Sequence, residues 1–251
     1  MNPFIRKVLG YAGATVVLLA GWQLLSWLIG SPALPGPVPA LTDFARLFFP
    51  ALVPQLAYST WRVLASVAIG TLLAVPLGLV LGRSPRADAV LAPLVFLSYP
   101  VPKAVFLPVL LVLLGIGNTS IVALITLIVF FQILVTARDA ARQIPSGSVT
   151  SVRSLGATRW QVFLHVVLPA SMPDVFTALR ISSGTAIAVL FFSESIAGQT
   201  GLGWYIYDAW GRIAYSEMFA GILAMALLGV VLYELIEVAE RRVCRWTRAG
   251  R

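Results

Sequence analysis

Long apolar runs are the feature of this sequence that most restricts its fold. Six of them approach the roughly 20 residues that a membrane helix needs: residues 8–29, 63–81, 90–114, 120–135, 175–197 and 218–238. Because the bilayer core offers backbone groups no water, only helices or a closed barrel can span it, and unbroken runs favour helices. A content of 59% hydrophobic and 11% charged residues excludes a water-soluble domain. We therefore predict an all-α, polytopic membrane protein with about six transmembrane helices.

The chain divides into three parts by composition. Residues 1–58 hold the first apolar run and a proline-rich connection, residues 59–240 form the core domain, and residues 241–251 are a basic tail. The first run follows Arg6 and Lys7, as in a secretory signal, but it exceeds the roughly 7 to 15 apolar residues of such a signal. It is interpreted as a retained helix, with a cleaved signal as the alternative.

The lysines and arginines predict the orientation, because cytoplasmic loops of membrane proteins carry an excess of both. With the N-terminus inside, 14 of the 18 fall on the cytoplasmic side: Arg6, Lys7, Arg83, Arg86, Arg138, Arg142, Arg153, Arg159, Arg180, Arg241, Arg242, Arg245, Arg248 and Arg251. Both termini and the loop 138–174 are then cytoplasmic. The net charge of +8 indicates contact with anionic membrane lipid. No nucleic acid is expected, since the charges form no continuous stripe.

A short amphipathic piece at residues 40–49 lies within the proline-rich stretch 31–59. On the outer side, such a piece either lies along the membrane or forms a lip against a soluble partner. The membrane-bound helix is the preferred interpretation.

The third apolar run is interrupted by prolines. Pro100 and Pro102 remove two backbone donors and disfavour helix at the residue before each. Irregular backbone at membrane depth is tolerated only inside protein or beside water, so we expect this segment to face the bundle interior. Lys103 is a cation in the same place, and it marks either the translocation pathway or a side chain that reaches back to the interface.

Glu194 is the second charge inside a predicted span, next to Ser193 and near the outer end. One interpretation is that Ser193 and Glu194 form a polar lining or gate in the outer half of the pathway. The alternative is a carboxylate bonded to helix ends in the following glycine-rich loop, at Gly201–Leu202–Gly203. Hydration near the outer surface would lower the cost of the charge in either case.

The polar and basic segment 150–173 stands out inside an apolar sequence. Its order of a short helix, Gly156, a second helical turn and Leu168–Pro169 resembles the cytoplasmic coupling loop of ABC importer permeases. That family opens the motif with Glu-Ala-Ala, where this chain has Thr150–Ser151–Val152. The proline segment 99–103, followed by Gly115–Ile116–Gly117, resembles the nitrate, sulfonate and taurine branch of these permeases.

The resemblance implies a type I ABC importer permease fold in the bacterial plasma (inner) membrane. It assigns contact with the ATPase to Arg153, Leu155, Gly156, Ala157, Arg159, Leu168 and Pro169. It assigns the pathway to Pro100, Pro102, Lys103, Ser193 and Glu194. We expect one short helix over residues 148–160, and Leu168–Pro169 should end the second helix of the loop.

The same resemblance implies partners. They are separate ATP-binding cassette subunits, a second copy of the permease and a periplasmic or lipoprotein solute-binding protein. The chain has no phosphate cradle of the form G-x-x-x-x-G-K-[ST]. No cofactor is therefore expected on this chain, because ATP would be bound by the partner subunit.

The predicted function is import of a small solute, such as a sulfonate, taurine or nitrate-like anion, by alternating access. Importers of thiamine or riboflavin precursors are an alternative within the class. A gradient-driven secondary transporter is a second alternative, although no internal repeat supports it. An enzyme is not expected, because one histidine, one cysteine and few carboxylates supply no catalytic set. Cys244 and His165 have no metal-site spacing.

Overall fold

The computed structural model describes the backbone of residues 3–248 and the side chains of residues 13–247, and over this range it contains helices and no strand. Four of the arginines and lysines used to predict the orientation lie outside the described side chains: Arg6, Lys7, Arg248 and Arg251. The long helices are α1 (Pro3–Ile29), α3 (Val53–Arg83), α6 (Asn118–Gln143), α9 (Leu168–Ala197) and α11 (Tyr215–Val243). The shorter ones are α2 (Pro37–Leu47), α4 (Pro85–Ser98), α5 (Leu107–Leu114), α7 (Ser146–Ser154), α8 (Arg159–Val162) and α10 (Leu202–Gly211).

The predicted spans correspond to these helices. Four helical stretches among the described residues are long and apolar enough to cross a membrane, and α4 with α5 forms a fifth, broken span bent by 83°. Helix α1 adds a shorter apolar segment, Gly13–Ile29. The prediction of about six spans is therefore consistent with the structure.

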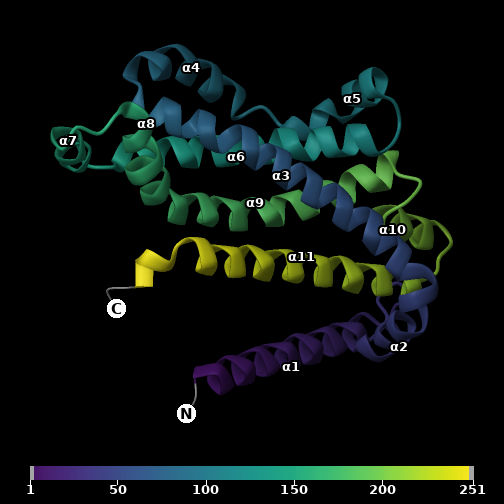
Figure 1. The fold of residues 1–251 in the computed structure, drawn as a ribbon. Helices are drawn as coiled ribbons and strands as arrows, with labels where there is room; N and C mark the ends of the chain where they lie inside the picture. The colour runs from purple at the N-terminus through teal and green to yellow at the C-terminus, as the bar shows by residue number, and fades with distance from the viewer. Residues whose placement is uncertain (1–2, 249–251) are drawn as a thin grey trace.

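The long helices run side by side in Figure 1, and short helices lie at the two opposite ends of the bundle. Helices α7 and α8 lie at the end that holds both termini, whereas α2 and α10 lie at the other end (Figure 1). We call these the α7–α8 end and the α10 end. The amphipathic piece predicted at residues 40–49 is helical, as the second half of α2 and the π-helical turn Phe48–Leu52.

Helices α3, α6 and α9 form the core of the bundle. Glycine brings α3 and α6 together: a Cβ on Gly78 would lie 2.7 Å from the carbonyl oxygen of Leu134. Small residues permit such close approach where lipid gives no hydrophobic force between helices. Helix α1 stands apart from this core (Figure 1) and contacts α11 through Trp22, which stacks on Phe219 at 5.4 Å.

The broken third span lies differently from our expectation. The backbone between α4 and α5 is irregular at the prolines, as predicted, but Pro100 and Pro102 are exposed on the surface of this chain instead of facing its interior. The interruption of the helix leaves backbone carbonyl oxygens without helical hydrogen-bond donors. The Lys103 ammonium donates to three of them, those of Ser98, Tyr99 and Val101, at 2.8, 2.9 and 3.2 Å.

Candidate functional site

The loop between α6 and α9 forms a helical hairpin at the α7–α8 end. Helix α7 ends at Ser154, a turn follows, and Thr158 caps α8 by accepting from the backbone N–H of Gln161 at 3.3 Å, while the Gln161 side chain accepts from the Thr158 N–H at 2.8 Å. Such a reciprocal cap fixes where a helix begins. The turn is therefore a defined structure and not a loose connection.

The turn exposes apolar side chains. Leu155 is 88% exposed and Trp160 is 65% exposed, although Trp160 stacks on Phe163 at 5.5 Å. Gly156 has φ +86°, a backbone conformation that favours glycine, and a Cβ there would meet nothing within 4 Å. Exposed apolar side chains on a fixed turn are typical of a surface that contacts another protein.

Two local expectations about this loop were wrong. Residues 148–160 do not form one helix, because positive φ at Gly156 divides them into α7 and α8. Leu168–Pro169 does not end a helix either. The chain stays helical from Arg159 through the π-helical turn Phe163–Val167 into α9, and Pro169 lies in the first turn of α9, where its missing N–H is tolerated.

The other residues predicted for the coupling loop lie along this hairpin. Arg153 lies near the end of α7 and Arg159 begins α8, and both side chains are exposed. Ala157 is half-buried in the turn. Their contact with an ATPase stays a prediction.

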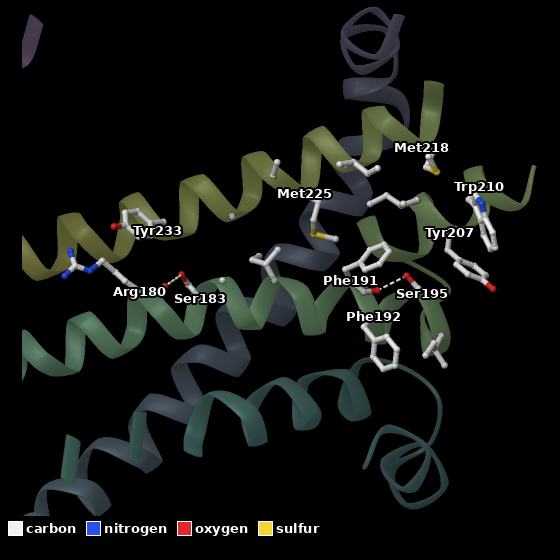
Figure 2. A pocket seen from close by; sticks show the side chains of 17 residues that line it. Arg180, Ser183, Phe191, Phe192, Ser195, Tyr207, Trp210, Met218, Met225 and Tyr233 are labelled. Carbon is white, nitrogen blue, oxygen red and sulfur yellow. Dashed lines mark hydrogen bonds between the residues drawn. The ribbon is translucent and has the colours of Figure 1, made fainter. Parts of the chain in front are cut away.

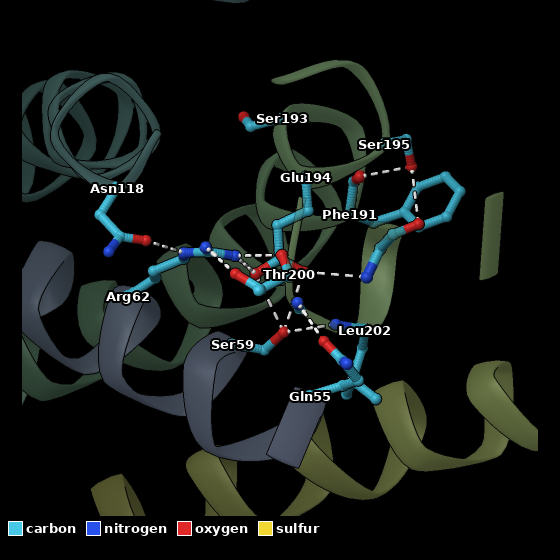
Figure 3. Close-up of polar contacts among 12 residues, drawn as sticks. Gln55, Ser59, Arg62, Asn118, Phe191, Ser193, Glu194, Ser195, Thr200 and Leu202 are labelled. Carbon is cyan, nitrogen blue, oxygen red and sulfur yellow. Dashed lines mark hydrogen bonds and ion pairs between the residues drawn. The ribbon is translucent and has the colours of Figure 1, made fainter. Parts of the chain in front are cut away.

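A buried polar network joins the helices at the α10 end (Figure 3). The carboxylate of Glu194 in α9 is fully buried and lies 2.6 Å from the guanidinium of Arg62 in α3, which is 2% exposed. Ser59, one turn before Arg62, bonds both carboxylate oxygens at 3.0 and 2.9 Å. The N–H of Gly203 in α10 donates to the same carboxylate at 2.9 Å.

The rest of the network fixes the loop between α9 and α10. The Arg62 guanidinium donates to the carbonyl oxygen and the hydroxyl of Thr200 at 2.6 and 2.8 Å, and its Nε donates to Asn118 at the start of α6 at 2.8 Å. The side chain of Gln55 accepts from the Gly201 N–H at 2.6 Å. One buried ion pair and its hydrogen bonds therefore connect α3, α6, α9 and α10.

Ser193 and Glu194 were predicted together but lie differently. Ser193 is buried and bonds only within its helix, to the carbonyl oxygen of Val189 at 2.7 Å, and it points away from the network in Figure 3. Glu194 adopts the arrangement of the alternative interpretation, with its carboxylate bonded to the start of the next helix. A role of either residue in the pathway stays a prediction.

Sequence reasoning missed Arg62, Ser59 and Gln55, because all three precede the predicted span 63–81. Helix α3 begins ten residues earlier, at Val53. A signal was available: positions 55, 59 and 62 are spaced as i, i+4 and i+7, which puts three polar side chains on one helix face.

A second ion pair lies toward the α7–α8 end. The Arg138 guanidinium in α6 makes two bonds to the Asp88 carboxylate in α4, at 2.5 and 2.8 Å, and Phe96 lies under the guanidinium at 5.2 Å. Arg138 is only 8% exposed at its side chain, although its sequence position indicated a cytoplasmic loop. The pair attaches the first half of the broken span to α6.

A groove of about 930 Å³ runs between α9 and α11 (Figure 2). Its walls are mostly apolar, with Tyr207 and Trp210 at the α10 end and Arg180 and Tyr233 toward the other end. Arg180 is paired with Glu240 at 3.2 Å. Neither Lys103 nor Glu194 lines this groove, so it is separate from the residues predicted for the pathway. Among the described residues, no three His, Cys, Asp or Glu side chains come together to hold a metal ion.

The chain matches known proteins over most of its length. Residues 74–245 match the family described as binding-protein-dependent transport system inner membrane component. The taurine transport system permease protein TauC of Escherichia coli is 31% identical, over 97% of this chain and 92% of that protein. The riboflavin transport system permease protein RibX of Chloroflexus aurantiacus is 31% identical, over 98% and 93%, and the nitrate import permease protein NrtB of Synechococcus elongatus is 28% identical, over 96% and 92%.

The fold agrees with these matches. A chain of the inward-facing MetNI methionine ABC transporter superposes with a TM-score of 0.65 at 22% identity, over 76% of this chain and 95% of the other. The long helices described above therefore have an ABC importer permease fold, and they supply its membrane spans. The chain belongs to the family of binding-protein-dependent transport system inner membrane components, the permease subunits of ABC importers.

Proposed function

We propose that this permease moves a small solute through alternating access driven by separate ATPase subunits, which dock on the turn at Leu155. The observation that carries the proposal is the exposed apolar surface of Leu155 and Trp160 on a capped helical hairpin. Helix α8 continues into α9, so closure of the ATPase would tilt a membrane helix directly. In this arrangement the α7–α8 end and both termini face the cytoplasm.

A second copy of the chain completes the membrane part of the transporter in this proposal. The irregular backbone at Pro100 and Pro102 is exposed on a single chain, yet such backbone is tolerated at membrane depth only against protein or water. A second permease packed over the break would satisfy this rule, and Lys103 would then lie near the boundary between the copies. A role of Lys103 along the pathway belongs to the same proposal.

The α10 end would receive a soluble binding protein on the opposite side of the membrane. The loop between α9 and α10 is held there by the Arg62–Glu194 network, so it presents a fixed surface. The proposed cargo is a small anion such as taurine, another sulfonate or nitrate, as the names of the related permeases suggest. A riboflavin-type cargo is the second candidate, favoured by the similarity to RibX.

Site-specific photo-crosslinking tests the docking surface. A benzoylphenylalanine at position 155 is expected to capture a protein with a P-loop when the transporter is expressed in its host. The matched control is the same probe at Ile213, which is 70% exposed and lies just after α10, at the opposite end. If position 155 captures no ATPase, or both positions capture it equally, docking at this turn is wrong.

The cargo is tested on the binding protein, since such proteins deliver the solute. The binding protein that is recovered with this permease is titrated calorimetrically with taurine, nitrate and riboflavin. If it binds riboflavin alone, the proposed anion is wrong and riboflavin is the cargo.

A further inference from the structure

A cavity of about 510 Å³ opens between the turn that joins α3 to α4 and the hairpin of α7 and α8. Four arginines line it, and no acidic side chain does. Arg83 ends α3 and Arg86 lies in the first turn of α4, on either side of the short α3–α4 junction, whereas Arg153 lies in α7 and Arg159 in α8. The four come from three segments of the chain, so folding assembles the site.

Most of this positive charge has no partner among the described residues. Arg86, Arg153 and Arg159 make no hydrogen bond or ion pair there, and Arg83 uses one nitrogen to bond the carbonyl oxygens of Ala141 and Ile144 at 3.4 and 3.2 Å. The nearby Asp88 is occupied by Arg138. Guanidinium groups that lie together without a carboxylate repel one another and attract an anion. Phosphate is a suitable anion, because its oxygens match the planar fork of N–H donors on each guanidinium.

The remaining walls are apolar. Pro85, Val149, Val162, Phe163 and Val167 line the cavity beside the arginines, and Val162 and Val167 are buried. Arg83 is the last residue of the membrane-spanning helix α3, so the cavity lies where that helix leaves the membrane. A ligand that carries a phosphate and an apolar part, and that resides at this depth, fits both halves of the lining. Basic pockets between membrane helices on the cytoplasmic side bind such lipid headgroups.

We propose that this cavity binds the phosphate headgroup of an anionic membrane phospholipid, and that the lipid connects the α3–α4 turn to the α7–α8 hairpin. Two of the lining arginines, Arg153 and Arg159, are also predicted ATPase contacts, but Leu155, Gly156 and Trp160 of the proposed docking turn do not line the cavity. We therefore assign the cavity to a lipid and make the ATPase an outcome of the test. The inference does not depend on the cargo.

Native mass spectrometry of the purified full chain tests the proposal, with phosphatidylglycerol and phosphatidylcholine as probes. The chain is expected to retain phosphatidylglycerol preferentially. Arg86→Gln should weaken retention of the lipid about fivefold, which is the factor expected when one arginine no longer attracts an anionic lipid. Arg86→Lys should retain the lipid, which separates loss of charge from misfolding. Arg242→Gln is the matched control, because Arg242 is an exposed arginine near the end of α11 that does not line the cavity.

Three results would overturn the proposal. The first is equal retention of phosphatidylglycerol by wild type, Arg86→Gln and Arg242→Gln. The second is displacement of the lipid by millimolar inorganic phosphate, which would make the site one for a soluble anion. The third is loss of the copurifying ATPase in Arg86→Gln with unchanged lipid retention, which would assign the arginines to the ATPase.

Discussion

The buried ion pair at the α10 end gives the sharpest test of what holds this permease together. Arg62→Met removes four hydrogen bonds and leaves the Glu194 carboxylate as a buried charge with only Ser59 and Gly203 as partners. Removing one member of a buried pair costs about 3–5 kcal/mol. For a chain of this size, that lowers the melting temperature by about 6–20 °C.

The assay is thermal unfolding of the detergent-purified protein, with a neighbouring substitution as control. Ser193→Ala removes a buried hydroxyl that takes no part in the network, because Ser193 bonds only to the carbonyl oxygen of Val189 in its own helix. This substitution should lower the free energy of unfolding by about 1 kcal/mol. The double variant Arg62→Met with Glu194→Gln should melt above Arg62→Met alone, because it no longer buries an unpaired carboxylate. Equal melting temperatures for Arg62→Met and Ser193→Ala would refute the reasoning.

Three further changes follow from local geometry. Gly156→Val forces a branched side chain into positive φ at a cost of about 1–2 kcal/mol, so uptake should fall while membrane insertion is unchanged; normal uptake would contradict a coupling role. Gly78→Val places a side chain against the backbone of Leu134 and should lower the melting temperature, whereas Gly184→Ala, with nothing within 4 Å, should not. Lys103→Met frees three backbone carbonyls and should lower both stability and uptake; unchanged transport kinetics would exclude Lys103 from the pathway.

The sequence predicted the helices better than it predicted their polar contacts. Apolar runs are local, so the spans at 120–135, 175–197 and 218–238 fall inside α6, α9 and α11. Arg62 and Glu194 are 132 residues apart, and no local pattern states that they meet. Glu194 was interpreted from its position near a span end, and Arg62 was not considered because it precedes the predicted span 63–81. Neither position shows that the two charges neutralise each other across two helices.

The helices of the loop between α6 and α9 were also predicted only in part. The sequence predicted one helix over residues 148–160, whereas Gly156 has positive φ and forms a turn within them. The continuation of α8 into α9 was missed, because a Leu-Pro pair usually suggests a helix stop, whereas here a π-helical turn precedes Leu168 and the helix continues past Pro169. Whether a proline ends a helix depends on which backbone donor it removes, and that depends on where the helix begins.

The coupling loop and the buried ion pair are mechanically continuous. The chain is helical over the 39 residues from Arg159 to Ala197, so Glu194 lies near one end of a rod whose other end is the proposed docking hairpin. Because Glu194 is bonded to Arg62, α9 cannot tilt away from α3 at the α10 end without breaking a buried pair. Helix α3 is in turn packed closely on α6 at Gly78. A displacement that enters at α8 is therefore expected to move α3, α6 and α9 as one body, and any bending should concentrate at the π-helical turn Phe163–Val167, where the helix is weakest.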